Sequence, residues 1–380
     1  MTIIGIVGAG AMGTGIAQIA SMSGCEVRLY DVNKDVCCNA ISNISSGINK
    51  LIEKGKLEPE VGVTILGRIY ICDSLKSMSD CHLVIEAVAE DILIKKEVFV
   101  SLESFVTSDC ILATNTSSLS ITSIASVLSS PDRCMGIHFF NPPVLMQLVE
   151  LIPAVQTKES TIHYAIDLIN SWGKTIVLAK DTPGFIVNKV ARPYYGEAIR
   201  IMEEGLSDIY KIDMAMTNHG FKMGPFTLMD FIGHDINYKV TESVWKSFFY
   251  DGKYRPSFTQ LRLLEAGYLG KKSGKGFYTY PNQNQEKNEI SSDELDTIFI
   301  RIISMLINEA ADTVYLGICS EKDVEMAVSL GLNFPKGLLA WGHEIGFNKI
   351  IEVLESLHHK YHEERYRVSP LLYKKLAHDA

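Results

Sequence analysis

The chain has 380 residues, more than a single domain usually contains, so we expect two or three domains. Apolar residues make up 47% and charged residues 21%, a balance that allows large cores and excludes a disordered chain. The formal net charge of −9 excludes a general attraction for nucleic acid or for an anionic membrane. A phosphate-bearing ligand must therefore be held by local geometry.

Residues 1–25 carry no charged side chain, a feature also typical of signal sequences and membrane spans. No basic segment precedes the apolar stretch and several glycines interrupt it, so we expect a buried strand followed by a glycine-rich loop instead. No other stretch is long and apolar enough to cross a bilayer. We therefore expect a cytoplasmic protein with no membrane partner and no nucleic-acid partner.

Short β-rich runs alternate with helical patterns over residues 1–182, which predicts a doubly wound α/β domain with a parallel sheet. The predicted helices are Met12–Ser23, Lys34–Lys54 and Ile92–Phe105. The predicted strands are Ile3–Val7, Glu26–Tyr30, His82–Val88, Cys110–Thr114 and Cys134–His138, with extra strands near Leu148–Pro153 and Thr175–Lys180.

The pattern changes at residue 183 to long helical stretches broken by Gly and Pro, which predicts an all-helical domain over 183–280. Residues 281–292 are polar and predict a linker. Residues 293–380 are predicted to be a degenerate repeat of the helical domain, because EAIRIMEEGLSDIYKIDMAM from Glu197 is similar to EAADTVYLGICSEKDVEMAV from Glu309. The expected fold class is thus a doubly wound parallel-sheet domain followed by all-helical domains.

No metal site is predicted. The eight cysteines are irregularly spaced and contain no C-x-x-C pair, which argues against a zinc site and against a disulfide scaffold. His358, His359 and His362 have no clear third ligand, so we interpret them as a solvated helix surface.

A G-x-G-x-x-G motif occurs at Gly8, Gly10 and Gly13, between a predicted strand and a predicted helix. In a Rossmann-type fold these glycines allow a tight turn, close approach of a pyrophosphate and packing of the helix on the strand. Asp31 ends the second strand, where its carboxylate can accept hydrogen bonds from the adenosine ribose and would repel a 2′-phosphate. The motif predicts NAD as cofactor; the alternative is a glycine-rich turn with Asp31 as a simple cap.

His138 and Glu150 flank the segment FFNPPVLMQLV, in which a turn at 141–143 could bring the two side chains together. A buried carboxylate fixes the tautomer of an imidazole and supports its charged form, so the ring can accept a proton. Such a pair suits oxidation of an alcohol without a metal. By itself, a His–Glu pair is more often structural than catalytic.

Eight motifs follow one another over residues 1–280. They are GAGAMGTGIAQ (8–18), EAVAED (86–91), NTSSL (115–119), GIHFFNPP (136–143), LVEL (148–151), DTPGFIVNK (181–189), GPFTLMDFIG (224–233) and GKKSGKGFY (270–278). In this order they resemble the L-3-hydroxyacyl-CoA dehydrogenases, including bacterial 3-hydroxybutyryl-CoA dehydrogenases. The resemblance implies NAD-dependent, reversible oxidation of an L-3-hydroxyacyl-CoA, with a short chain such as 3-hydroxybutyryl-CoA, to the 3-ketoacyl-CoA.

The resemblance also implies roles for the polar residues around the predicted reaction centre. His138 would be the acid/base and Glu150 its orienting partner. Ser117 and Asn188 would hydrogen-bond the reacting oxygen and hold the substrate. Without the resemblance, Ser117 could equally be a turn or helix-cap serine, and Asn188 a surface helix residue.

Further contacts follow from the same resemblance. Glu90 and Lys95 match positions near the nicotinamide and the cofactor phosphates, Lys272 matches a cofactor-contacting lysine, and Asn141 lies where cofactor or substrate contacts are expected. Lys54 matches a CoA-binding lysine and Lys56 lies near it. A family serine close to that lysine is Gly47 here, which puts the CoA contact in doubt.

The single-copy members of this family use the helical domain as their homodimer contact, which suggests a meaning for the repeat. Aligning the repeats places Ile300 opposite Asn188 and, after a small shift, Trp341 opposite Asp230. The second repeat thus lacks the predicted substrate amide. We expect residues 293–380 to pack on 183–280 as an intrachain pseudo-dimer, with homo-oligomerisation left open.

Two other functions remain open at this point. A dehydrogenase of the same fold could act on a small hydroxy acid or sugar acid without CoA. A non-catalytic nucleotide-binding protein is also compatible with the fold, because fold does not fix function.

Overall fold

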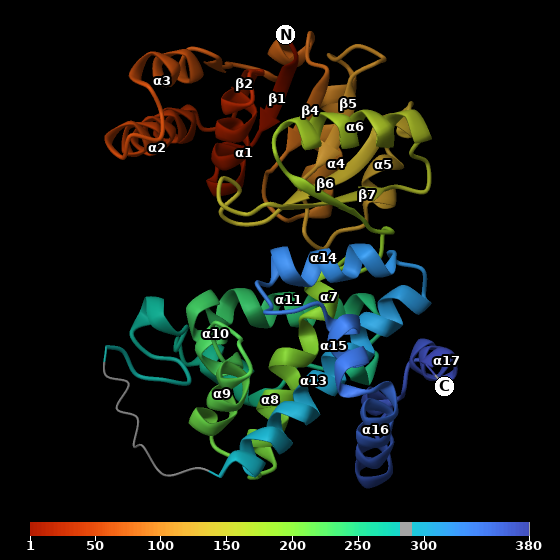
Figure 1. Cartoon of the computed structure of the whole chain (residues 1–380). Helices are drawn as coiled ribbons and strands as arrows, with labels where there is room; N and C mark the ends of the chain where they lie inside the picture. The colour runs from red at the N-terminus through yellow and green to blue at the C-terminus, as the bar shows by residue number, and fades with distance from the viewer. Residues whose placement is uncertain (282–290, 380) are drawn as a thin grey trace. The chain divides into compact units, whose positions relative to one another are not determined.

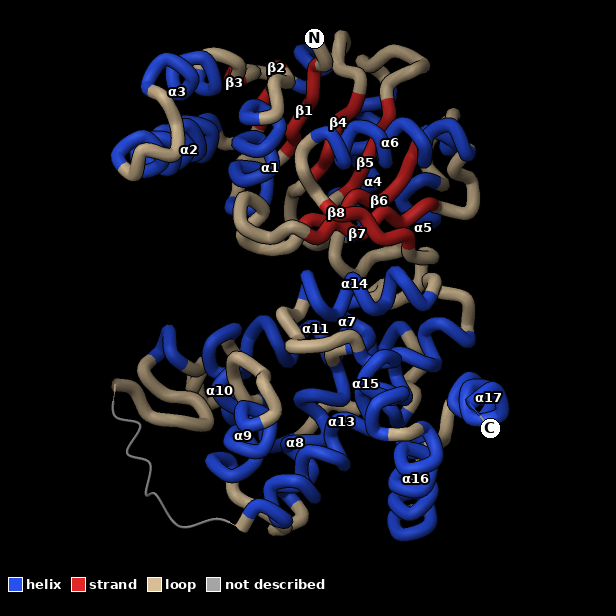
Figure 2. Tube along the Cα trace, in the orientation of Figure 1, coloured by secondary structure: helices blue, strands red, loops and turns tan. Residues whose placement is uncertain are grey.

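The computed structural model describes residues 1–281 and 291–379, and its contacts separate Met1–Thr182 from Pro183–Ala380 as two units (Figure 1). Strands belong to the first unit, whereas the described part of the second unit is helical (Figure 2). Most of the predicted linker, 281–292, lies outside the described residues. No helix in the described ranges is long and apolar enough to span a membrane.

The first unit is built on one eight-stranded sheet with the order β3-β2-β1-β4-β5-β6-β7-β8. Neighbouring strands are parallel except for β6 and β7, which pair antiparallel. This doubly wound arrangement confirms the predicted fold class. The strands are β1 (Ile3–Val7), β2 (Glu26–Tyr30), β3 (Ile69–Ile71), β4 (Leu83–Glu86), β5 (Ile111–Thr114), β6 (Cys134–Phe139), β7 (Leu148–Pro153) and β8 (Thr175–Leu178).

Helices cover the sheet because its central strands are apolar on both faces. Ile4 and Ile6 of β1 are fully buried in a core that also takes Ile16 and Ile44 from two helices. A strand buried on both sides is typical of a parallel sheet and explains the continuous apolar runs in the sequence. The helices of this unit are α1 (Ala11–Met22), α2 (Lys34–Glu53), α3 (Pro59–Leu66), α4 (Ile92–Glu103), α5 (Ile121–Ala125) and α6 (Glu159–Ser171).

The helices of the second unit are described in two series that follow the predicted repeat, and we call them the first copy (α7–α12) and the second copy (α13–α17). The predicted alignment places α13 opposite α7 and α8. The first copy consists of α7 (Val187–Val190), α8 (Arg192–Glu203), α9 (Ile209–Asn218), α10 (Pro225–Ile232), α11 (His234–Ser247) and α12 (Phe258–Glu265). The second copy consists of α13 (Ser292–Tyr315), α14 (Glu321–Gly331), α15 (Leu338–Ile345), α16 (Phe347–Tyr361) and α17 (Pro370–Asp379).

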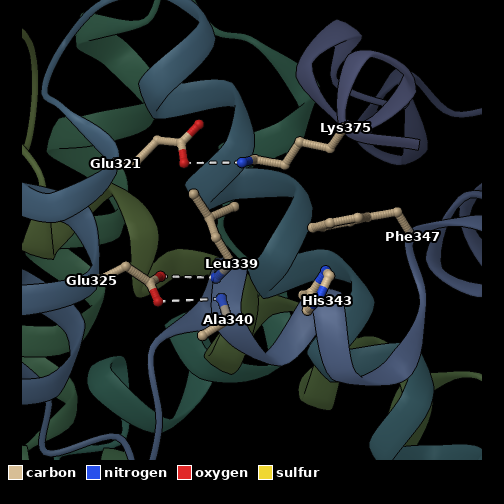
Figure 3. Close-up of a pocket in the computed structure, with 7 residues that line it drawn as sticks. All are labelled: Glu321, Glu325, Leu339, Ala340, His343, Phe347 and Lys375. Atoms are coloured by element: carbon tan, nitrogen blue, oxygen red, sulfur yellow. Dashed lines mark hydrogen bonds and ion pairs between the residues drawn. The ribbon is translucent and has the colours of Figure 1, made fainter. Parts of the chain in front are cut away.

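The same capping device recurs in both copies. In the first copy, the Asp213 carboxylate accepts hydrogen bonds of 2.8 and 2.9 Å from the backbone N–H groups of Phe226 and Thr227 at the start of α10. In the second copy, Glu325 accepts bonds of 2.8 and 3.2 Å from the N–H groups of Leu339 and Ala340 at the start of α15 (Figure 3). A carboxylate at a helix N-terminus satisfies orphan donors and complements the helix dipole.

This correspondence corrects one residue match. α10 and α15 each end at a glycine with positive φ, Gly233 and Gly346. Counting back from these glycines places His343 opposite Asp230, not the predicted Trp341. α14 has 11 residues where α9 has 10, so the offset between the two series grows from 112 at Glu197 and Glu309 to 113 at Asp230 and His343.

The surroundings of Asp230 and His343 differ. Asp230 accepts hydrogen bonds of 2.9 Å from the backbone N–H groups of Phe277 and Tyr278. His343 lines a cavity of about 450 Å³. Figure 3 shows the Glu321–Lys375 ion pair of 2.9 Å at this cavity.

Candidate active site

The glycine-rich loop joins β1 to α1, and each motif glycine has its own physical reason. Gly8 has φ +101°, and a Cβ there would lie 2.6 Å from the Ala87 carbonyl oxygen. A Cβ on Gly13 would lie 1.8 Å from the Gly8 carbonyl oxygen. A Cβ on Gly10 would meet no atom within 4 Å. Packing therefore explains Gly8 and Gly13, whereas Gly10 leaves open space for close approach of a pyrophosphate.

The residues around this space fit a dinucleotide. No side chain caps the start of α1, so its first N–H groups can serve a phosphate. Asp31, at the end of β2, accepts a hydrogen bond of 2.8 Å from the Ala9 N–H and one of 3.0 Å from the Asn33 N–H. These bonds fix the carboxylate beside the loop, where the adenosine ribose is expected.

His138 and Glu150 lie directly opposite each other on the antiparallel strands β6 and β7. The distance from His138 Nδ1 to Glu150 Oε2 is 2.7 Å. Glu150 is fully buried and His138 is 5% exposed. Phe140 packs against the imidazole with ring centroids 4.5 Å apart. The carboxylate therefore fixes the ring orientation and can stabilise a protonated imidazole.

Asn115 holds this part of the sheet in place, a role that the sequence did not reveal. Its Oδ1 accepts a hydrogen bond of 2.8 Å from the backbone N–H of Phe139, the residue after His138. The bond connects the end of β5 to the end of β6. Asn115 belongs to the NTSSL motif, and this position could have identified it as a structural residue of the site.

Glu90 binds the loop that carries Ser117. Its Oε1 accepts hydrogen bonds of 2.6 Å from Thr116 Oγ1 and of 3.0 Å from the Ser117 N–H. Ser117 Oγ lies 3.3 Å from the same oxygen. Burial would raise the pKa of Glu90, but the positive charge of Lys95 and these donors lower it, so the carboxylate is ionised. Ser120, not Ser117, caps α5, so the cap alternative for Ser117 does not apply.

Lys95 lies behind Glu90 and is 1% exposed. Its Nζ is 2.6 Å from Glu86 Oε1 and 3.4 Å from Glu90 Oε2. Glu86, fully buried at the end of β4, also accepts a hydrogen bond of 2.7 Å from Thr114 Oγ1. The sequence reasoning missed Glu86, whose signal was a lone charge at the end of an apolar strand. Direct contact of Lys95 with the cofactor stays a prediction.

The predicted CoA and loop contacts lie at the surface of the first unit. Lys54 is exposed at the C-terminal end of α2, and Asn141 is exposed in the connection between β6 and β7. A shallow hollow of about 600 Å³ follows α2. Its polar lining consists of Ser42, Ser45, Ser46, Asn49, Lys50 and Glu53.

Two predicted site residues belong to the second unit. Asn188 is half-buried on α7, and its carbonyl oxygen accepts a hydrogen bond of 2.8 Å from Arg192 Nε. Lys272 is paired with Asp235 at 2.5 Å, and 43% of its side chain is exposed. Contact of Asn188 with the substrate and contact of Lys272 with the cofactor stay predictions.

The fold and the glycine-rich loop define a protein that binds a dinucleotide. The family model described as 3-hydroxyacyl-CoA dehydrogenase, NAD binding domain, matches residues 3–182. The model of the C-terminal domain matches residues 184–280 and again 298–380. The chain therefore belongs to the 3-hydroxyacyl-CoA dehydrogenase family. It is an oxidoreductase that uses NAD, which confirms the predicted family, enzyme class and cofactor.

Some known proteins are similar to nearly the whole chain, and others to about three quarters of it. A 3-hydroxyadipyl-CoA dehydrogenase of Escherichia coli K12 is 33% identical, with 97% of this chain and 96% of that protein covered. A crystal structure of 3-hydroxybutyryl-CoA dehydrogenase from Escherichia coli K12 has a TM-score of 0.93 and 33% identity, with 99% and 98% of the chains covered. A probable 3-hydroxybutyryl-CoA dehydrogenase of Deinococcus radiodurans is 41% identical, but covers only 73% of this chain with 99% of its own length.

Proposed function

We propose that the protein reversibly oxidises a short-chain L-3-hydroxyacyl-CoA, such as 3-hydroxybutyryl-CoA, to the 3-ketoacyl-CoA. The observation that carries the proposal is the buried contact of 2.7 Å between His138 Nδ1 and Glu150 in the nucleotide-binding unit. The names of the relatives, which include hydroxybutyryl and hydroxyadipyl thioesters, support an acyl-CoA substrate.

His138 is the proposed proton acceptor. Oxidation of the alcohol removes a hydride from C3 and a proton from the hydroxyl oxygen, and bound NAD supplies the hydride acceptor. Because Glu150 engages Nδ1, the ring takes the hydroxyl proton at Nε2. Glu150 stabilises the resulting positive charge, and the same proton returns to oxygen in the reduction.

Ser117 and Asn188 are proposed to hydrogen-bond the substrate oxygen. Neutral donors stabilise developing negative charge without giving up a proton. For Ser117, the contacts of its N–H and Oγ with the ionised Glu90 support a fixed position. Glu90, Lys95, Asn141 and Lys272 are proposed to contact the cofactor or to place the groups that do.

An assay of the native protein tests the substrate class. NADH consumption with acetoacetyl-CoA and NADH formation with L-3-hydroxybutyryl-CoA are expected. Turnover only with free hydroxy acids or sugar acids would select the CoA-independent alternative. Binding of NADH without turnover of any substrate would select the non-catalytic alternative.

Replacing Lys54 by Ala is expected to raise the KM for the CoA thioester by about 1.4- to 5-fold, because an exposed charge contact contributes roughly 0.2–1 kcal/mol. Lys54 and Lys56 are proposed to contact the CoA phosphates, and both side chains are exposed at the end of α2. The KM of the N-acetylcysteamine thioester, which lacks these phosphates, should not change. An equal increase for both substrates would contradict the assignment.

We also propose that the second copy replaces the second subunit of a dimer. Arg301 of α13 pairs with Glu197 of α8 at 2.6 Å, and Glu309 of α13 pairs with Lys189 of α7. Tyr366 donates to Glu197 at 3.0 Å, and Tyr254 of the first copy donates to Glu309 at 2.6 Å. Such reciprocal contacts are what a two-fold interface produces between identical subunits.

Removing residues 293–380 is expected to leave a protein that unfolds more easily or associates with itself, because the apolar faces of α8 and α9 lose α13. Sedimentation velocity and thermal unfolding would measure the change. A truncated protein that stays monomeric, stable and fully active would contradict the pseudo-dimer.

A cytoplasmic location is also proposed, and the eight free cysteines support it.

A further inference from the structure

Asn188 lies on a short helix that follows a strained turn. α7 contains four residues, and Ala191 alone separates it from the 12-residue helix α8. Gly184 and Phe185, which precede the cap residue Ile186, have φ values of 72° and 46°. A left-handed conformation is unfavourable for Phe and persists only where the surroundings enforce it. The place of Asn188 must therefore be set by contacts outside α7.

Lys189, the next residue, supplies such a contact. Its side chain is fully buried, forms an ion pair with Glu309 and donates a hydrogen bond of 2.9 Å to Thr313 Oγ1. Both partners lie on α13 of the second copy. The Lys189 N–H also donates a bond of 3.1 Å to the Gly184 carbonyl oxygen, which closes the turn that presents Asn188.

Glu309 is held as a buried anion by several groups. Lys253 Nζ lies 2.6 Å from Oε2, and Tyr254 OH donates a bond of 2.6 Å to Oε1. Burial would raise the pKa of Glu309, but the charges of Lys189 and Lys253 lower it to about 2. For Lys189, burial lowers the pKa of the ammonium group, and the charge of Glu309 opposes this shift.

A related ion pair joins Arg301 to Glu197, and Arg301 also contacts Glu204 and Tyr366. Arg301 corresponds to Lys189 and Glu197 to Glu309, and both Arg301 and Glu197 are buried. The residue before Arg301 is Ile300, at the position of Asn188. The ion pair of Lys189 and Glu309 is thus next in sequence to a predicted substrate residue, whereas the ion pair of Arg301 and Glu197 is not.

We propose that Glu309 of the second copy is a positioning residue, which acts through Lys189 to hold α7 so that Asn188 can bind the substrate. This inference rests on the proposed role of Asn188. It gives the second copy a part in activity as well as in packing.

The test compares Glu309→Gln with Glu197→Gln in the full-length protein. Glu309→Gln should lower kcat/KM for acetoacetyl-CoA at least tenfold while the KM for NADH changes less than twofold. Glu197→Gln removes the corresponding charge and should leave kcat/KM within twofold of the native value once rates are corrected for the folded fraction. Equal losses in the two variants would overturn the inference, because they would indicate a purely structural role. Restoration of at least half of the lost kcat/KM by Glu309→Asp would support it.

Two further variants keep the outcome decisive. If Glu309→Gln does not fold, Thr313→Val removes the milder contact with Lys189 and should lower kcat/KM about threefold; no change would overturn the inference. In an Asn188→Ala background, Glu309→Gln should cause no further loss. If Asn188→Ala alone had no effect, the proposed roles of both Asn188 and Glu309 would fail, whereas the role of His138 would be untouched.

Discussion

Replacing His138 by Gln should lower the kcat for oxidation of L-3-hydroxybutyryl-CoA by about 10³-fold. A positioned acid or base typically contributes about 10²–10⁴-fold, and a glutamine amide cannot take up the hydroxyl proton. Its amide can still donate a hydrogen bond to Glu150, so the sheet should keep its structure. NADH formation measures the rate, and quenching of protein fluorescence by NADH should give an unchanged Kd.

His163 offers a matched control on the same unit. It forms a pair with Glu159 at 3.5 Å, but both side chains are exposed, at 68% and 89%. His163→Gln should therefore leave kcat unchanged. If His138→Gln retained more than a tenth of the native kcat, a different group would have to accept the proton.

Replacing Lys95 by Met should lower the free energy of unfolding by about 3–5 kcal/mol, the usual cost of leaving one member of a buried ion pair without its partner. Glu86 is fully buried and its Oε1 lies 2.6 Å from Lys95 Nζ. The pKa of Glu90, which burial raises and Lys95 lowers, should move upward. Urea unfolding monitored by circular dichroism measures the loss.

An exposed lysine and a double replacement act as controls for Lys95. Lys34 pairs with Asp73 at 2.7 Å at an exposed site, so Lys34→Met should have little effect. Combining Glu86→Gln with Lys95→Met removes both charges and should recover part of the lost stability. If the Lys95→Met protein were as stable as the Lys34→Met protein, loss of Lys95 would not leave a buried, unpaired charge on Glu86, and the prediction would be wrong.

The sequence predicted the sheet well where strands are buried on both faces. The ends of β1, β2 and β7 match the predicted ranges. β1 is an apolar run that ends at a glycine, β7 is apolar except for Glu150, and β2 alternates buried with half-buried residues. β3 was missed because it has only three residues and leaves Tyr70 exposed at the sheet edge. Such an edge strand carries no periodicity that distinguishes it from a loop.

Parts of the candidate site could also be predicted, for reasons that differ between residues. His138 and Glu150 lie in two apolar runs joined by a proline-containing turn. Because such runs pair as antiparallel strands, the two residues were expected to lie close together. The network around Glu86 depends on the parallel order of β4 and β5, which a linear pattern does not contain. The ion pairs Lys189–Glu309 and Arg301–Glu197 join residues more than 100 positions apart in the sequence. The alignment of the predicted repeat was therefore the one sequence feature that indicated them.

A crystal structure of the native protein with NAD and acetoacetyl-CoA would test most directly whether His138 handles the substrate proton. We predict that Nε2 lies about 2.6–3.2 Å from the 3-keto oxygen, a distance that allows proton transfer. Nδ1 should remain on Glu150. A keto oxygen bound elsewhere, or an imidazole turned away from it, would contradict the proposed chemistry.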